Sequence, residues 1–168
     1  MAEIDHVVVP GTFDPITYGH IDVIRRATRM FSHVTVAVAA SVNKRGSGTA
    51  FTLEERTEMV KEALLEEGVT CGVEVKAFDG LLVDFCRQID ARGIVKGLRA
   101  MTDFEYELQQ ADLNFRMAKD IESVFVMSSP EYGYVSSSVV REIASLGSDV
   151  HLLVPPCIQR KLVVHYGK

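Results

Sequence analysis

The sequence predicts an α/β fold, namely a doubly wound five-stranded parallel sheet with helices on both faces. Short apolar runs rich in β-branched residues alternate with longer segments of helical periodicity, an order typical of parallel sheets. Because crossovers between parallel strands are right-handed, the helices then cover both faces of the sheet. The sequence contains no linker, low-complexity tract or internal repeat, so residues 1–168 are expected to form a single domain.

The first half of the chain predicts three strands and two helices. The strands are short and apolar, whereas the first helix repeats apolar residues at a spacing of three, as in Ile21, Ile24 and Ala27. Thr52 and Glu55 have the spacing of a capping box, which marks the start of the second helix. The predicted strands cover residues 6–10, 33–40 and 72–78, and the predicted helices cover residues 20–31 and 53–64.

The second half continues the alternation with two strands and four helices. A second capping box, Thr102 with Glu105, is expected to open a helix with Phe104, Leu108 and Phe115 on one face. These side chains are expected in the core or in a subunit contact. The predicted strands cover residues 93–97 and 123–127, and the predicted helices cover residues 81–92, 103–117, 136–146 and 157–167.

The composition argues against several classes of protein. The formal net charge is −5, from 18 Lys and Arg against 23 Asp and Glu, which disfavours a nucleic-acid-binding protein with a diffuse basic face. No apolar stretch has the length of a membrane span, and the acidic N-terminal segment differs from a signal peptide. A cytoplasmic protein without membrane contact is therefore expected. The three cysteines lack the spacing of a metal site or a disulfide framework and are expected to be buried thiols.

Cationic and hydroxyl side chains follow the predicted strands. Ligands of doubly wound sheets bind beyond the carboxyl ends of the strands, so the residues after each strand form the candidate site. A protein of net negative charge that gathers cations there is suited to a phosphate-rich ligand. The residues after the strands are His20, Lys44, Arg45, Arg99 and the serines 136–138, and Lys96 lies at the end of the fourth strand.

The loop after the first strand, "GTFDPITYGH" at residues 11–20, has the properties of an anion site. Gly11 allows a sharp turn, and Pro15 makes the loop rigid. Gly19 and His20 fall at the start of a helix, where free N–H groups and the helix dipole favour an anion. The same dipole disfavours an imidazolium ion, so we expect His20 to be a neutral hydrogen-bond donor rather than only a cap or a surface residue. The loop matches neither a Walker A motif nor the GxGxxG fingerprint.

Two motifs carry a resemblance to a known family. Residues 17–20, "TYGH", resemble the T/H-x-G-H motif of the nucleotidyltransferase superfamily. Residues 135–138, "VSSS", followed by Arg141, resemble its second motif, I-S-S-T/S-x-x-R/K. The motifs lie at opposite ends of the chain, each after a predicted strand. The resemblance implies the Rossmann-like nucleotidyltransferase fold.

Within this superfamily the chain resembles the bacterial phosphopantetheine adenylyltransferases. The segments "PGTFDPIT", "FTLEER", "GLRA", "DFEYELQ" and "VSSS" occur in the order and spacing of that family. The resemblance implies transfer of the adenylyl group of ATP to 4'-phosphopantetheine, which gives dephospho-coenzyme A and pyrophosphate, with Mg²⁺ as cofactor. It also implies a cytoplasmic homohexamer, a dimer of trimers, with coenzyme A as feedback ligand.

The resemblance also implies roles for residues at matching positions. His20 would stabilise the transition state, and Lys44 and Arg99 would contact the reacting phosphates. Lys96 stands where many members have arginine, so the charge is kept and the bidentate fork is lost. The implied ATP-binding residues are Thr12, Phe13, His20, Gly97, Leu98, Arg99, Glu107, Tyr132, Gly133, Tyr134, Val135, Ser136, Ser137 and Ser138, and the implied phosphopantetheine-binding residues are Thr12, Lys44, Leu82 and Lys96.

The implied reaction needs neither a general base nor a covalent intermediate. A phosphate oxygen that is already an anion attacks the α-phosphorus of ATP in line, so catalysis depends on positioning and charge stabilisation. Ser136–Ser138 are therefore expected to be hydrogen-bond donors and a helix cap, and Arg45 a solvated loop charge. Asp14 and Asp103 could assist Mg²⁺, but their spacing makes no metal site, and Mg²⁺ commonly binds through substrate phosphates and water.

Two alternatives remain open on sequence alone. Another adenylyltransferase or cytidylyltransferase of the superfamily, for instance one acting on nicotinamide mononucleotide or glycerol phosphate, would share both motifs. A regulatory nucleotide-binding module would bind ATP and release no pyrophosphate with any acceptor. The release of pyrophosphate therefore separates the second alternative from the first.

Overall fold

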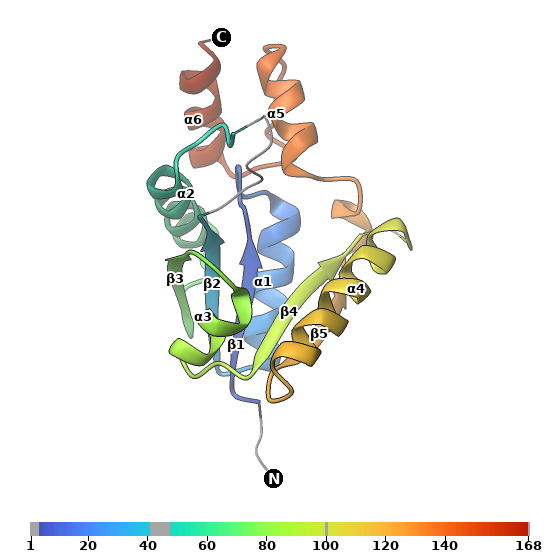
Figure 1. Ribbon diagram of the computed structural model, residues 1–168. Coiled ribbons are helices and arrows are strands. Elements are labelled where there is room, and N and C mark those ends of the chain that lie inside the picture. Colours follow the sequence, from blue (N-terminus) through green and yellow to red (C-terminus); the bar gives the residue numbers. More distant parts are fainter. Residues whose placement is uncertain (1–3, 41–47, 100, 168) are drawn as a thin grey trace.

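The computed structural model describes residues 4–40, 48–99 and 101–167, and its centre is a five-stranded sheet (Figure 1). The strands are β1 His6–Gly11, β2 His33–Ala39, β3 Val73–Phe78, β4 Gly93–Leu98 and β5 Glu122–Met127. All neighbouring strands are parallel, in the order β3-β2-β1-β4-β5. The order changes direction at β1, which confirms the predicted doubly wound topology.

Helices cover both faces of this sheet, as predicted. They are α1 Tyr18–Met30, α2 Leu53–Glu66, α3 Leu82–Gln88, α4 Met101–Met117, α5 Ser137–Ser145 and α6 Pro156–Tyr166, with a short 3₁₀ turn at Pro130–Tyr132. One core cluster packs α1, α2, α5 and α6 against alternate strand residues such as Val7 and Val34. A smaller cluster packs α3 against Val8, Ala37 and Ile94 on the other face. α5 and α6 lie beyond the carboxyl ends of the central strands (Figure 1).

Short polar side chains and a glycine set the ends of several helices. Thr52 accepts the backbone N–H of Glu55, and the Glu55 carboxylate accepts that of Thr52, which confirms the predicted capping box. Ser136 caps α5 by accepting the N–H of Val139. Gly147 follows the end of α5 with a φ of 78°, the left-handed conformation that favours glycine.

The pairing of β1 with β4 opens a crevice at the carboxyl edge of the sheet. Only Val7 and Val8 of β1 are in register with β4, whereas every other neighbouring pair of strands matches six residues. β1 and β4 therefore diverge toward their carboxyl ends (Figure 1). A Cβ at Gly97 would lie 2.6 Å from Cγ2 of Val23, so glycine lets α1 pack against β4 beside the crevice. Doubly wound folds bind ligands at this change of strand order.

The structure corrects the predicted start of α4 and excludes the core as the location of its apolar face. The helix begins at Met101, soon after β4 ends, so Thr102 lies inside its first turn and cannot be its N-cap. The apolar face of α4 is not in the core, because Phe104, Leu108 and Phe115 are 40%, 42% and 50% exposed. The helix lies at the outer side of the molecule, and no described segment packs over this face (Figure 1). The alternative, a subunit contact, stays a prediction.

The structure tests two expectations drawn from composition. Cys86 and Cys157 are buried, as predicted, but Cys71 is exposed because it lies in the surface turn that leads into β3. All three are free thiols. Within the described ranges, no helix combines the length and the apolar character that crossing a membrane requires.

We expect Gly72→Ala to destabilise the fold more than Gly68→Ala. Both glycines have a positive φ, 70° and 69°, so alanine is strained at either position. A Cβ at Gly72 would also lie 2.6 Å from the backbone oxygen of Ser32, whereas one at Gly68 has nothing within 4 Å. Strain alone should cost about 1 kcal/mol, and strain plus overlap about 2–4 kcal/mol. Urea unfolding measures both losses, and equal losses would contradict this explanation.

Candidate active site

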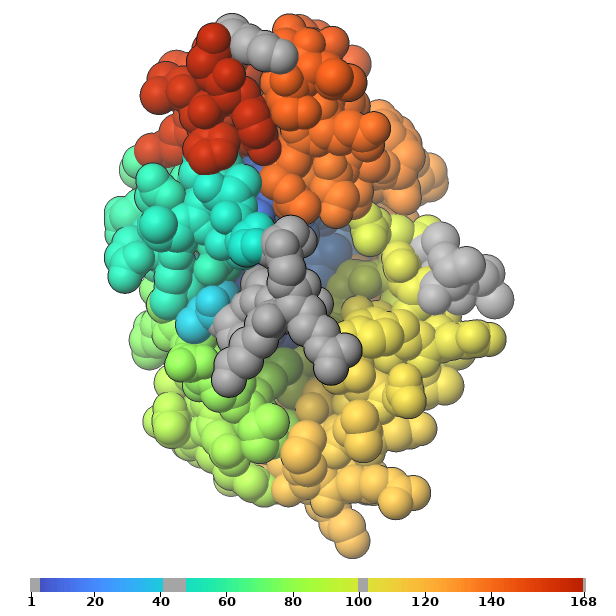
Figure 2. Space-filling view, turned by 45° about the horizontal axis from the view of Figure 1, so that its top comes forward, coloured from blue at the N-terminus to red at the C-terminus, as the bar shows by residue number. Residues whose placement is uncertain are grey.

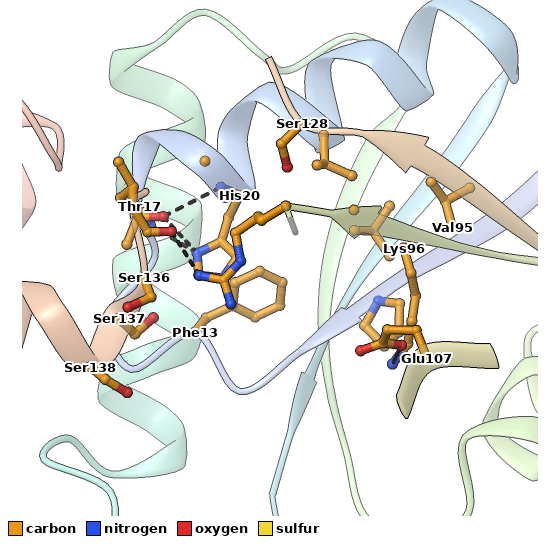
Figure 3. A pocket seen from close by; sticks show the side chains of 17 residues that line it. Phe13, Thr17, His20, Val95, Lys96, Glu107, Ser128, Ser136, Ser137 and Ser138 are labelled. Carbon is orange, nitrogen blue, oxygen red and sulfur yellow. Dashed lines mark hydrogen bonds and ion pairs between the residues drawn. The ribbon is translucent and has the colours of Figure 1, made fainter. Parts of the chain in front are cut away.

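A pocket of about 330 Å³ lies over the crevice between β1 and β4. Figure 2 shows the hollow between the orange segment that contains α5 and the yellow α4, and Figure 3 shows its side chains. Residues of both sequence motifs meet here, although they are more than 100 positions apart in the chain. The lining residues are Val9, Pro10, Phe13, Thr17, Gly19, His20, Val23, Val95, Lys96, Gly97, Arg99, Glu107, Ser128, Val135, Ser136, Ser137 and Ser138.

The start of α1 holds the ring of His20 in one tautomer. Thr17 is the N-cap of α1, and His20 is its third residue. The backbone N–H of Thr17 donates to Nδ1 of His20 at 3.0 Å, so the proton of the neutral ring is on Nε2. The backbone N–H of His20 donates in turn to the Thr17 hydroxyl at 3.4 Å. The hydrogen bonds that cap α1 therefore also orient the ring of His20, so that its Nε2–H can donate to a ligand in the pocket (Figure 3).

Electrostatics keep this imidazole neutral. Burial, and to a smaller extent the charge of Arg99, lowers the pKa of His20 to about 4. Arg99 reaches across the pocket, since its Nη1 donates to the backbone carbonyl of Val135 at 2.9 Å. Its Nε lies 3.4 Å from Oδ2 of Asp103. The site thus combines a neutral donor and a guanidinium, as an anionic ligand requires.

We expect His20 to make the folded protein less stable at pH 5 than at pH 7.5. The folded pKa is about 4 against an ordinary value of 6.5, so between these values the unfolded chain binds a proton that the folded chain does not. The contribution of His20 to the free energy of unfolding is therefore fully present above pH 6.5 and is lost as the pH falls toward 4. The loss attributable to His20 is about 2 kcal/mol at pH 5. Urea unfolding measures it, and His20→Gln should remove this part of the slope. An unchanged slope would contradict the assignment.

The N-terminus of α5 forms a second wall of the pocket. The Ser136 hydroxyl is engaged in capping, which confirms the predicted cap, and the Ser137 hydroxyl donates to the carbonyl of Pro15 at 2.7 Å. Ser138 is exposed. The groups that α5 offers to an anion are therefore its first backbone N–H groups and the Ser138 hydroxyl.

Asp14 and Arg141 connect the two motifs beside the pocket. Nη1 of Arg141 donates to the backbone carbonyl of Asp14 at 2.6 Å and lies 3.6 Å from its Oδ2. The Asp14 carboxylate is buried and accepts the N–H groups of Ala50 and Phe51 at 2.9 and 3.0 Å. One carboxylate thus joins the first loop to α5 and to the segment before α2.

Arg56 holds the same loop from the side of α2. Its side chain is 1% exposed and donates to the backbone carbonyls of Thr12 at 2.6 Å, Ala39 at 2.9 Å and Phe51 at 3.2 Å. Phe13, which follows Thr12 in the chain, has a φ of 50°, a conformation that costs a non-glycine residue about 1–3 kcal/mol. Arg56 therefore stabilises a strained loop that lines the pocket. Hydrophobic periodicity did not reveal this residue, because it does not mark a buried cation.

Lys96 and Glu107 form an ion pair on the other side of His20 from the serines (Figure 3). Nζ of Lys96 lies 2.9 Å from Oε2 of Glu107, and the side chains are 27% and 20% exposed. This carboxylate oxygen is buried and has no further hydrogen-bond partner among the described residues. Lys96 therefore presents little net charge to the pocket until a ligand separates it from Glu107.

Several residues implied by the family resemblance lie outside the pocket lining. Leu82 packs against the core cluster around α3, and the ring of Tyr132 lies 6.1 Å from that of Tyr18. Lys44 and Arg45 fall outside the described residues. Among the described residues that the resemblance implies, those outside the lining are Thr12, Leu82, Leu98, Tyr132, Gly133 and Tyr134.

Five lining residues are not among the residues that the sequence indicates as candidates. Ser128 is the first residue after β5, so the rule that selects residues after strands could have found it. The other four are Val9, Pro10, Val23 and Val95, which carry no polar group and left no signal beyond hydrophobic pattern.

A wider groove of about 740 Å³ lies between α2 and α6 and differs in chemistry. Four glutamates of α2 line it, opposite Arg160 and Lys161. Lys161 is already paired with Glu62 at 3.2 Å, and Arg160 with Glu66 at 3.8 Å. The carboxylates make this groove a poorer polyphosphate site than the pocket over β1 and β4.

Known proteins share this chain's sequence and fold. The family model described as cytidylyltransferase-like matches residues 8–143, a range that contains both motifs. A phosphopantetheine adenylyltransferase from Moorella thermoacetica is 51% identical over 160 residues, covering 95% of this chain and 96% of that protein. One from Thermobifida fusca is 48% identical over 162 residues, covering 96% and 94%.

A solved structure shows the same fold at much lower identity. The putative nicotinate-nucleotide adenylyltransferase from Vibrio parahaemolyticus superposes with a TM-score of 0.73 at 14% identity, covering 96% of this chain and 99% of that one. That likeness shows the Rossmann-like fold alone, whereas identity near one half over nearly the whole length shows the family. The chain therefore belongs to the cytidylyltransferase-like family of nucleotidyltransferases and, within it, to the phosphopantetheine adenylyltransferases.

Proposed function

We propose that this nucleotidyltransferase transfers the adenylyl group of ATP to 4'-phosphopantetheine, giving dephospho-coenzyme A and pyrophosphate. Relatives that are about half identical over nearly their whole length carry the name of this activity. The observation that carries the proposal is one pocket in which the His20 donor faces ligand space shared with Arg99 and the N-terminus of α5. These groups suit the phosphates of ATP.

The reaction is an in-line displacement at the α-phosphorus. An oxygen of the acceptor phosphate forms a bond to the α-phosphorus. At the same time the bond from the α-phosphorus to the oxygen that bridges the α- and β-phosphates breaks, and pyrophosphate leaves. The attacking oxygen is already an anion, so no side chain has to remove a proton. Nε2–H of His20 donates to an oxygen of the transferring group, and the N–H groups of α5 bind the departing phosphates. Both are fixed before the substrate arrives, which reduces reorganisation during the reaction.

The acceptor phosphate takes the cations on the β4 side of the pocket. Its negative charge competes with Glu107 for Lys96, so binding exchanges one ion pair for another. Arg99 lies between this part of the pocket and the α5 side, where it can contact either phosphate. We assign Lys44 to the reacting phosphates on the family resemblance alone.

The family generally uses a divalent metal, and for this chain we propose Mg²⁺ bound together with ATP. The carboxylates at the pocket are engaged elsewhere: Asp14 accepts two backbone N–H groups, Asp103 pairs with Arg99, and Glu107 pairs with Lys96. This arrangement fits an ion held by triphosphate oxygens and water rather than by a protein carboxylate. The ion would supply charge neutralisation for the leaving pyrophosphate.

The outer face of α4 supports the proposed homohexamer, a dimer of trimers. Its exposed apolar side chains include Phe104, Leu108 and Phe115, and a contiguous apolar face of this kind marks a protein contact. Coenzyme A shares the pantetheine arm and the adenylyl group of the product, so we assign it to the same pocket as a feedback ligand. We place the enzyme in the cytoplasm.

Pyrophosphate release tests the function. The purified chain is offered ATP or CTP with 4'-phosphopantetheine, nicotinamide mononucleotide or glycerol 3-phosphate in separate reactions. We expect release only with ATP and 4'-phosphopantetheine. Release with another pair would instead identify a different transferase of the superfamily. ATP binding without release in any reaction would identify a nucleotide-binding module.

A further inference from the structure

A cluster of metal-ligand side chains lies at the edge of the sheet opposite the pocket. His6 opens β1, His33 opens β2, and Glu74 is the second residue of β3. In the parallel register His6 pairs with His33, and Thr35 pairs with Glu74. Because side chains alternate along a strand, His33 and Thr35 share a face, so all four side chains lie on one face of three adjacent strands. The backbone itself brings them together.

The ligand atoms of His6, His33 and Glu74 are close enough to share one ion. They all lie within 4.8 Å of one another. Nε2 of His33 is 3.2 Å from Oε1 of Glu74, near the separation of roughly 3.4 Å that zinc bonds of 2.0–2.1 Å impose in a tetrahedral site. The two imidazole rings are stacked at 3.9 Å, so they must turn about their soft terminal torsions to face the same ion.

The surroundings orient the imidazole of His6. Thr35 is fully buried, and its hydroxyl lies 2.8 Å from Nε2 of His6 and donates to Oε1 of Glu74 at 2.9 Å. Thr35 therefore contacts two of the three side chains and holds them near each other.

We propose that His6, His33 and Glu74 form a binding site for a divalent transition-metal ion such as Zn²⁺, separate from the adenylyl-transfer site. Two imidazoles and one carboxylate suit Zn²⁺, Co²⁺ or Ni²⁺ better than Mg²⁺, which prefers oxygen ligands. A bound ion joins β1, β2 and β3 at their amino ends and keeps one position for water. Lys76 is the competing cation, because its Nζ lies 3.1 Å from Oε1 of Glu74 and has to move into solvent.

The test is Zn²⁺ binding by the whole chain without nucleotide. Calorimetric titration and the melting temperature both measure this binding. A hundredfold excess of Zn²⁺ over its Kd should raise the melting temperature by about 5–10 °C, and Mg²⁺ should not. His6→Ala and Glu74→Gln should each weaken Zn²⁺ binding by about 10-fold or more. Lys76→Met should strengthen it several-fold, because it removes the competing cation and keeps every ligand.

His151→Ala and Cys71→Ser are the matched controls, since each removes one exposed ligand atom outside the cluster. Both should bind Zn²⁺ as the parent does. The proposal is overturned if the parent shows neither heat nor a shift in melting temperature, if His6→Ala and Glu74→Gln bind like the parent, or if Cys71→Ser abolishes binding. If His6→Ala does not fold, Lys76→Met still decides, because only a site containing Glu74 gives tighter binding in that variant.

Discussion

His20→Ala should lower the turnover number of adenylyl transfer by about 10²–10³-fold, by analogy with the loss of one preorganised donor to a developing oxyanion. The reason is geometric: Thr17 accepts and donates at the start of α1 so that the neutral ring carries its proton on Nε2 at the pocket. ATP binding should change much less, because Arg99 and the N-terminus of α5 remain. Steady-state pyrophosphate release and nucleotide titration measure the two effects.

His20→Gln is the control that separates chemistry from folding. Glutamine at the third helical position accepts the N–H of a threonine N-cap, so Thr17 with Gln at this position forms an ordinary capping box. We expect His20→Gln to keep the melting temperature close to that of the parent and still to lose most of the turnover. Parental turnover in the stable Gln variant would remove the imidazole from the mechanism.

Arg56→Met should destabilise the fold by about 3–5 kcal/mol, the range found when one partner of a buried charged network is removed. The variant removes this donor from the carbonyls of Thr12 and Ala39, whereas the carbonyl of Phe51 keeps the Thr49 hydroxyl, and each buried unpaired carbonyl costs about 1–3 kcal/mol. Urea unfolding measures the loss. Since Thr12 leads into the strained Phe13, the KM for ATP should rise as well.

Arg25→Met is the matched control for Arg56→Met. Arg25 also lies on a helix and also bonds a backbone carbonyl, that of Glu67 at 3.2 Å, but its side chain is 40% exposed. Its loss should cost no more than about 1 kcal/mol. If both variants lost the same small stability, Arg56 would not be the residue that holds the loop.

The parallel, doubly wound sheet and the position of the pocket could be predicted because they follow from local pattern and general topology. β-branched runs alternate with helical periods, which predicts a parallel sheet, and ligands bind where its strands end. This reasoning placed His20, Arg99 and Ser136–Ser138 at one edge, and the structure brings them into one pocket.

Features that depend on distances between remote residues could not be predicted. The Lys96–Glu107 ion pair joins a strand to a helix that follows it in the chain. The helical pattern around Arg56 predicts a surface position for this residue, although its side chain is buried. The sequence predicts that the apolar side chains of α4 lie either in the core or in a subunit contact, because periodicity does not distinguish the two, and the structure shows them exposed in the single chain. One feature was available locally: Thr17 and His20 have the spacing of a capping box, with histidine in the place of the usual glutamate or glutamine.

The most direct test of the pocket is a crystal structure with α,β-methylene ATP, an analogue that cannot transfer its adenylyl group. We expect its α-phosphate within hydrogen-bond distance of Nε2 of His20 and its outer phosphates at the first N–H groups of α5. Phosphates bound in the groove between α2 and α6, or anywhere out of reach of His20, would contradict the assignment of this pocket as the site of adenylyl transfer.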